Sequence, residues 1–80
     1  MKEVKDILIE WGKAKYHYPD FHSMHEGYAV LLEEVHELWD IVKQKGSDRN
    51  KDEIIEECNQ IAAVALRIKT DLIDSGKYKI

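Results

Sequence analysis

Two carboxylates, those of Glu34 and Glu37, interrupt an apolar stripe near the middle of the chain. Val30, Glu34, Glu37 and Ile41 follow one another at steps of three and four, the spacing of one helix face. A carboxylate between buried aliphatic side chains is costly unless its charge is satisfied. Residues 30–42 contain no lysine or arginine that could do so. A bound divalent metal ion is therefore the leading candidate for a partner.

A second acidic stripe lies further along the chain, where Asp52, Glu56 and Asn59 recur at helical spacing. If the two helices formed an antiparallel hairpin, up to three carboxylates and one amide oxygen would surround a single point. Oxygen ligands in that number suit Mg²⁺ or Mn²⁺ better than zinc. Glu57 lies on the neighbouring, more apolar stripe and could replace Glu56 as the ligand.

Three helices are needed to position these residues. Periodicity and capping residues predict them over about residues 3–15, 23–45 and 51–74. Pro19 marks a loop before the second helix, and Ser23 with Glu26 fits a capping box at its start. We expect Phe21 and Tyr18 to plug this loop into the core rather than to form a lid over a ligand. The short polar turn after the second helix makes it antiparallel to the third.

The chain of 80 residues is near the lower size limit for a stable single core. We expect residues 1–80 to form one all-α domain, a helical hairpin plus an N-terminal helix. The centre of the third helix, residues 61–66, is apolar on every side, and two companion helices cannot enclose it. We therefore expect a homodimer or homotetramer in which helices from different copies complete a four-helix-type bundle.

Composition argues against several classes of function. The single cysteine cannot form an internal disulfide and fits a reducing compartment. The net charge of −4 argues against general nucleic-acid binding, which needs a basic surface. The sequence has neither an apolar run of membrane-spanning length nor a secretory apolar region at its start. We expect a cytoplasmic protein without nucleic-acid or membrane partners.

Several other conspicuous side chains are assigned to structure rather than to chemistry. Trp11, Trp39 and Cys58 lie at helical spacing among apolar residues, so we expect them to pack in the core. The long cations that could reach a phosphate are more typical of surface charge: Lys13, Lys43, Lys51 and Arg67.

The acidic residues also resemble a known motif. Glu33-Glu34-x-x-Glu37, followed after eighteen residues by Glu56-x-x-Asn59, is similar to the EExxE…ExxD signature of the MazG-like all-α nucleotide pyrophosphohydrolases. The resemblance extends from about residue 22 to 72. It implies a Mg²⁺- or Mn²⁺-dependent enzyme that hydrolyses a nucleoside triphosphate to the monophosphate and pyrophosphate. By this motif the metal ligands would be Glu34, Glu37, Glu56 and Asn59, and Glu33 would support a ligand or the attacking water.

One departure from the motif raises alternatives. Asn59 stands where the family has an aspartate, so it keeps an oxygen but loses a charge, and Mg²⁺ should bind more weakly unless Glu57 or Asp52 compensates. A non-catalytic helical oligomer that binds nucleotides or regulates a partner is therefore a second hypothesis. A di-iron carboxylate bundle is a third, because Glu33-x-x-His36 has the spacing of its ligands. These two residues project away from the apolar face, which argues against that bundle.

Overall fold

Three helices make up most of the computed structural model, which describes residues 1–79. Helix α1 spans Lys2–His17, α2 spans Met24–Val42 and α3 spans Lys51–Ile68. A π-helical segment, Lys69–Ile73, extends α3, and short 3-10 turns lie at Gly46–Asp48 and Lys77–Lys79. The described residues form no strand, so the predicted all-α class and three helices are confirmed. Within the same residues, no helix combines the length and apolar character needed to cross a membrane.

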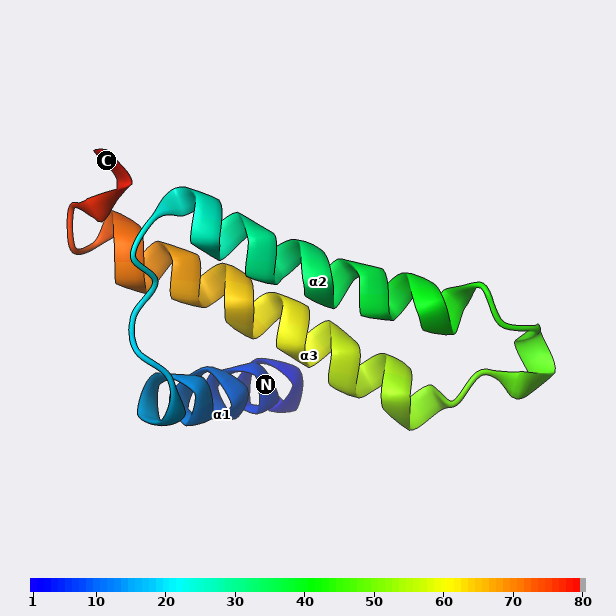
Figure 1. Ribbon diagram of the computed structural model, residues 1–80. Helices are drawn as coiled ribbons and strands as arrows, with labels where there is room; N and C mark the ends of the chain where they lie inside the picture. The colour runs from blue at the N-terminus through cyan, green and yellow to red at the C-terminus, as the bar shows by residue number, and fades with distance from the viewer. Residues whose placement is uncertain (80) are drawn as a thin grey trace.

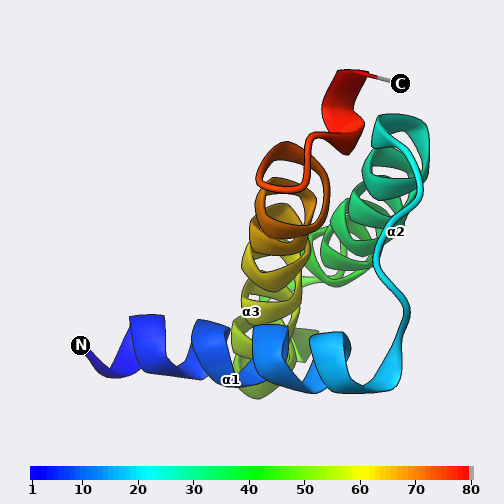
Figure 2. The same cartoon turned by 90° about the vertical axis from the view of Figure 1, so that its left-hand side faces the viewer.

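The helices α2 and α3 lie side by side as an antiparallel hairpin, as predicted (Figure 1). Helix α1 packs mainly on α3, and Figure 2 shows it lying across that helix. The hairpin is closed by Arg49, whose guanidinium donates hydrogen bonds of 3.0 and 2.5 Å to the carbonyl of Val42. This contact satisfies a carbonyl left without a helical partner at the end of α2. Helix α2 therefore ends at Val42, three residues before the predicted end at Lys45.

Side chains cap the starts of α2 and α3. The Ser23 hydroxyl accepts a hydrogen bond from the Glu26 N–H at 3.1 Å, as the capping box predicts. The Glu26 carboxylate reaches back one residue beyond the cap, to the N–H of His22 at 2.7 Å. Asn50 caps α3 by accepting from two N–H groups of its first turn. These local contacts set where the two helices of the hairpin begin.

A buried charge network holds the loop before α2 against the hairpin. Asp71 is 1% exposed, and its carboxylate accepts hydrogen bonds from the Lys15 ammonium and from the Phe21 N–H, the latter at 3.1 Å. The Arg67 Nε lies 3.7 Å from the same carboxylate. Arg67 also donates to the Pro19 carbonyl at 3.1 Å and lies 4.1 Å from the centre of the Phe21 ring. A buried carboxylate is tolerable here because two cations and an N–H satisfy it.

The structure corrects several side-chain assignments. Phe21 is 4% exposed and plugs the core as expected, but Tyr18 is exposed. Arg67, expected on the surface, is buried, because Asp71 one turn later gives it a partner inside the fold. Trp39 and Cys58, expected in the core, are exposed. Their helical spacing identifies an apolar face correctly but does not say what covers that face.

A glycine allows α2 to approach the end of α3 closely. Gly27 is buried, and a Cβ at this position would lie 2.9 Å from Ile68 Cγ1 and 3.4 Å from Leu72 Cδ1. Leu72 is fully buried, so its side chain has little room to move aside. The close contact at this end of the hairpin therefore requires the absence of a side chain at residue 27.

We expect Gly27→Ala to lower the free energy of unfolding by about 1 kcal/mol, because overpacking outweighs the gain in helix propensity. Gly12→Ala is the matched control. No described atom lies within 4 Å of a Cβ at residue 12, and that helical position is exposed. This control should raise stability by up to about 1 kcal/mol. Urea denaturation followed by circular dichroism measures both changes, and equal stabilisation by the two substitutions would contradict the close approach.

Candidate functional site

Three carboxylates meet between α2 and α3. Glu34 and Glu37 of α2 and Glu57 of α3 each place one carboxylate oxygen within 4.8 Å of the others. The step of three residues puts the two α2 acids on one face of their helix. Glu34 and Glu57 are half-buried and Glu37 is exposed, so the cluster lies at the edge of the hairpin's interior.

Glu57 is the member of the cluster whose charge is least satisfied. Its Oε1 is buried, and within residues 1–79 it has no hydrogen-bond partner. Burial, followed by close contact with Glu34 and repulsion from Glu34 and Glu37, raises the pKa of Glu57 to about 8. A divalent cation would supply the missing partner and offset the repulsion. A ligand set made only of carboxylate oxygens fits Mg²⁺ or Mn²⁺.

The other predicted site residues lie outside this cluster. Glu56 is exposed and borders a cavity of about 350 Å³ that Glu37 and Glu57 of the cluster also line. That cavity is lined by Glu37, Asp40, Ile41, Glu53, Glu56 and Glu57. Asn59 is half-buried and follows Glu57 by two residues, which turns it about 200° round the helix. Glu33 is exposed and lies about 100° round α2 from Glu34.

The apolar pattern of α3 explains why Glu57, rather than Glu56, faces α2. Glu57 shares its stripe with aliphatic residues, whereas the stripe of Glu56 contains Asp52 and Asn59. An antiparallel partner packs on the more apolar stripe. Val64 of the Glu57 stripe is buried, and residues of α2 pack against its cluster. The apolar residues on the stripe of Glu57 are visible in the sequence, from which Glu57 was predicted as the alternative ligand.

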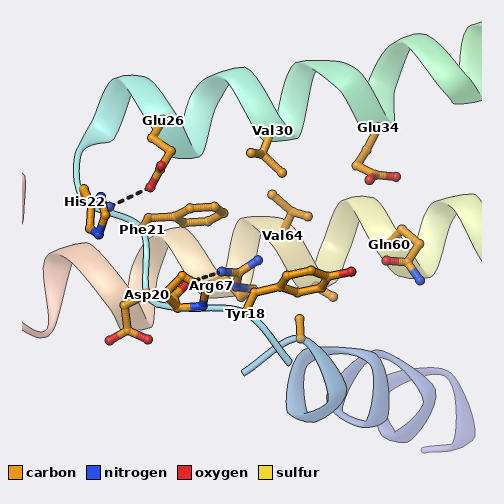
Figure 3. Close-up of a pocket in the computed structure, with 13 residues that line it drawn as sticks. Tyr18, Asp20, Phe21, His22, Glu26, Val30, Glu34, Gln60, Val64 and Arg67 are labelled. Carbon is orange, nitrogen blue, oxygen red and sulfur yellow. Dashed lines mark hydrogen bonds between the residues drawn. The ribbon is translucent and has the colours of Figure 1, made fainter. Parts of the chain in front are cut away.

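A larger cavity, of about 390 Å³, adjoins the acidic cluster at Glu34. It forms where the end of α1, the following loop and the hairpin meet (Figure 3). Its lining residues are Ala14, Tyr18, Pro19, Asp20, Phe21, His22, Glu26, Val30, Glu34, Gln60, Ala63, Val64 and Arg67. Figure 3 shows the Tyr18 side chain extending toward Gln60, on the side of the pocket where Glu34 also lies. The volume is suited to a small molecule.

Gln60 and Tyr18 had not been predicted as site residues. Neither belongs to a recognisable motif, and their shared position arises only when α1 and the loop fold onto α3. The Gln60 amide donates a hydrogen bond to Glu10 of α1 at 2.9 Å, which orients it beside the pocket. The pocket therefore forms by tertiary packing, and the local sequence pattern does not reveal it.

Scans of the chain against models of protein families, curated proteins and solved structures find no match. The MazG-like resemblance therefore stays a prediction from the acidic motif. Any proposed function depends on the geometry of the carboxylate cluster and on the pocket beside it.

We expect Glu57 to make the stability of the metal-free protein fall as pH rises. The pKa of this carboxyl is about 8 in the folded chain and about 4.5 when unperturbed. Between these values the folded chain holds a proton that the unfolded chain has released, so the free energy of unfolding decreases with pH. Glu57→Gln should flatten this slope between pH 5 and 8.

Urea denaturation in the presence of a chelator at several pH values measures the slope. Glu56→Gln is the control, because it removes an exposed neighbouring carboxylate and should leave the slope unchanged. The same slope in wild type and Glu57→Gln would show that Glu57 does not hold the proton.

Proposed function

We propose that the protein is a metal-dependent nucleoside triphosphate pyrophosphohydrolase, which cleaves a (d)NTP to the (d)NMP and pyrophosphate. The observation that carries this proposal is the meeting of three carboxylates within 4.8 Å, two from α2 and one from α3. The pocket of about 390 Å³ beside them supports it, because Glu34 belongs to both. The resemblance of the acidic motif points to the same reaction.

In this proposal Glu34, Glu37 and Glu57 would hold Mg²⁺ or Mn²⁺, and Glu57 would have to be deprotonated to act as a ligand. When bound, the ion supplies charge to offset the triphosphate and helps form the nucleophile from water. Glu33 is exposed beside Glu34 and is proposed to orient the attacking water. Glu56 borders the acidic cavity next to Glu57, where it would face a second ion.

In this proposal the pocket determines how the substrate is oriented. A nucleoside in the apolar pocket would place its phosphates at the Glu34 end, where the carboxylates meet. The exposed ring of Tyr18 offers a stacking surface, and the Gln60 amide offers hydrogen bonds. These two residues would hold the nucleoside while the acidic cluster holds the phosphates through the ion.

The charges around the site predict that the triphosphate binds only together with a metal. The second cavity is lined by five carboxylates, which repel phosphate. Arg67 lines the larger pocket, but Asp71 and the Pro19 carbonyl already engage its guanidinium. A bound divalent ion would therefore be the main positive charge facing the substrate.

A non-catalytic nucleotide-binding or regulatory module is the second candidate. It is favoured by the positions of Glu56 and Asn59, because Glu56 does not join the three-carboxylate cluster and Asn59 lies about 200° round α3 from Glu57. A weakly held ion could still support binding of a nucleotide without supplying enough charge to accelerate hydrolysis.

We expect Mn²⁺- or Mg²⁺-dependent release of pyrophosphate from at least one member of a panel of (d)NTPs. Glu37→Gln should lower the rate at least about 100-fold, because losing a metal ligand costs more than losing a group that only supports one. Glu3→Gln on α1 is the control, since it removes an exposed carboxylate of the same kind far from the cluster in sequence. A coupled pyrophosphatase assay measures the product.

Absence of metal-dependent turnover on every nucleotide would rule out the enzyme. Calorimetry would then separate the alternatives, since tight nucleotide binding without hydrolysis selects the binding module. If Glu33→Gln slows turnover while Mn²⁺ affinity is unchanged, its role lies with the water rather than with the metal.

A further inference from the structure

The buried arginine of the larger pocket has hydrogen-bonding capacity that the fold uses only in part. Arg67 is 6% exposed, and it lines the cavity of about 390 Å³. A guanidinium has five N–H groups. One Nη donates to the Pro19 carbonyl at 3.1 Å, and the Nε has no hydrogen-bond partner among residues 1–79. Because a buried donor without an acceptor costs free energy, this side chain favours a pocket ligand that accepts hydrogen bonds.

The charge of Arg67, in contrast, is already balanced. Lys15 donates hydrogen bonds to the carboxylates of Asp20 and Asp71, the former at 2.5 Å. The Arg67 Nε lies 3.7 Å from the Asp71 carboxylate, so two cations face two carboxylates at this end of the pocket. A phosphate placed here would add negative charge beside both acids. The group that fits beside Arg67 is therefore a neutral acceptor, such as a carbonyl oxygen or a ring nitrogen.

The guanidinium of Arg67 is held in place before any ligand binds. Its central carbon lies 4.1 Å from the centre of the Phe21 ring, and Phe21 is itself fixed by the hydrogen bond from its N–H to Asp71. The bond to the Pro19 carbonyl holds one Nη. Figure 3 shows the guanidinium drawn between the rings of Phe21 and Tyr18, which line the same pocket. A planar fork fixed in this way can recognise a pair of acceptors with little further ordering.

Helix α3 sets the distance between Arg67 and the acidic cluster. Four residues recur at steps of three, four and three along one side of this helix: Glu57, Gln60, Val64 and Arg67. At 1.5 Å per residue, Gln60 lies about 4.5 Å and Arg67 about 15 Å beyond Glu57 along the axis. The Gln60 amide nitrogen donates to Glu10, which leaves its carbonyl oxygen to accept from a sugar hydroxyl. If the phosphates lie at the carboxylates, the sugar lies near Gln60 and the base reaches Arg67.

We infer that Arg67 recognises the base and that the pocket selects guanine-type nucleotides, whose purine carries a carbonyl at position 6. This inference rests on the proposed function, which places the phosphates at the acidic cluster. Guanine presents two adjacent acceptors, O6 and N7, and the arginine fork matches that pair. Adenine and cytosine present an amino group on the corresponding edge, so N–H would face N–H. Thymine presents a single carbonyl there.

The preference is tested by calorimetry with the α,β-methylene analogues of ITP and ATP in the presence of Mn²⁺. Hypoxanthine has a carbonyl at position 6 where adenine has an amino group, so this pair isolates the contact with Arg67. Wild type should bind the ITP analogue at least about 10-fold more tightly than the ATP analogue. Because the analogues block cleavage between the α and β phosphates, the ratio of affinities is independent of turnover.

The outcomes separate base recognition from hydrolysis. Equal affinities in a protein that releases pyrophosphate from nucleotides would overturn the base assignment and leave the enzyme standing. A preference for the ITP analogue without turnover of any nucleotide would support base recognition and rule out the enzyme. Failure to bind either analogue would overturn the base assignment as well.

Two matched substitutions assign the preference to one side chain. Arg67→Lys keeps a charge beside Asp71 but loses the planar fork, so the ratio should fall to about threefold or less. Arg49→Lys makes the same exchange in the turn between α2 and α3, where Arg49 bonds to the Val42 carbonyl, and should keep the wild-type ratio. A preference retained in folded Arg67→Lys would overturn the assignment.

A further readout needs no substitution at Arg67, in case Arg67→Lys does not fold. The chain contains two arginines, so the spectrum of Arg49→Lys identifies the guanidinium NMR signals of Arg67. The ITP analogue should shift these signals because the base accepts hydrogen bonds from them. Binding of the ITP analogue that leaves the Arg67 signals unchanged would contradict the inference.

Discussion

Mutual repulsion among three carboxylates is the constraint that the rest of the structure must overcome. Apolar packing between α2 and α3, with Val64 at its buried centre, brings Glu34, Glu37 and Glu57 within reach of one another. The charge network around Asp71 holds the loop and α1 in place and so forms the pocket beside them. The fold thus stabilises an arrangement of acids that their own charges disfavour.

The buried carboxylate of Asp71 and the half-buried carboxylate of Glu57 have opposite surroundings. Asp71 receives two cations and a backbone N–H, so its charge is satisfied within the fold. Glu57 instead lies beside the carboxylates of Glu34 and Glu37, and its Oε1 has no partner within the described residues. A structural role accounts for Asp71 completely, whereas Glu57 requires either a proton or a cation. This contrast is the strongest reason to treat the acidic cluster as a binding site.

Local patterns in the sequence predicted the helices and the cap at Ser23, because that side chain acts on the first turn of its own helix. Helical spacing also predicted that Glu34 and Glu37 would share one face of α2, and they do, although Glu37 is exposed. The choice between Glu56 and Glu57 is a rotation of about 100° that depends on which stripe of α3 meets α2. The burial of Arg67 depends on a loop nearly fifty residues away, and local spacing cannot reveal such a contact.

Titration of the metal-free protein with Mn²⁺ by calorimetry at pH 7, in two buffers of different ionisation enthalpy, tests the central claim most directly. The account predicts about one Mn²⁺ bound per chain, with about one proton released per ion as Glu57 ionises. In Glu57→Gln both the affinity and the proton release should fall. Absence of Mn²⁺ binding, or binding that is unchanged in Glu57→Gln, would contradict a cation held by these three carboxylates.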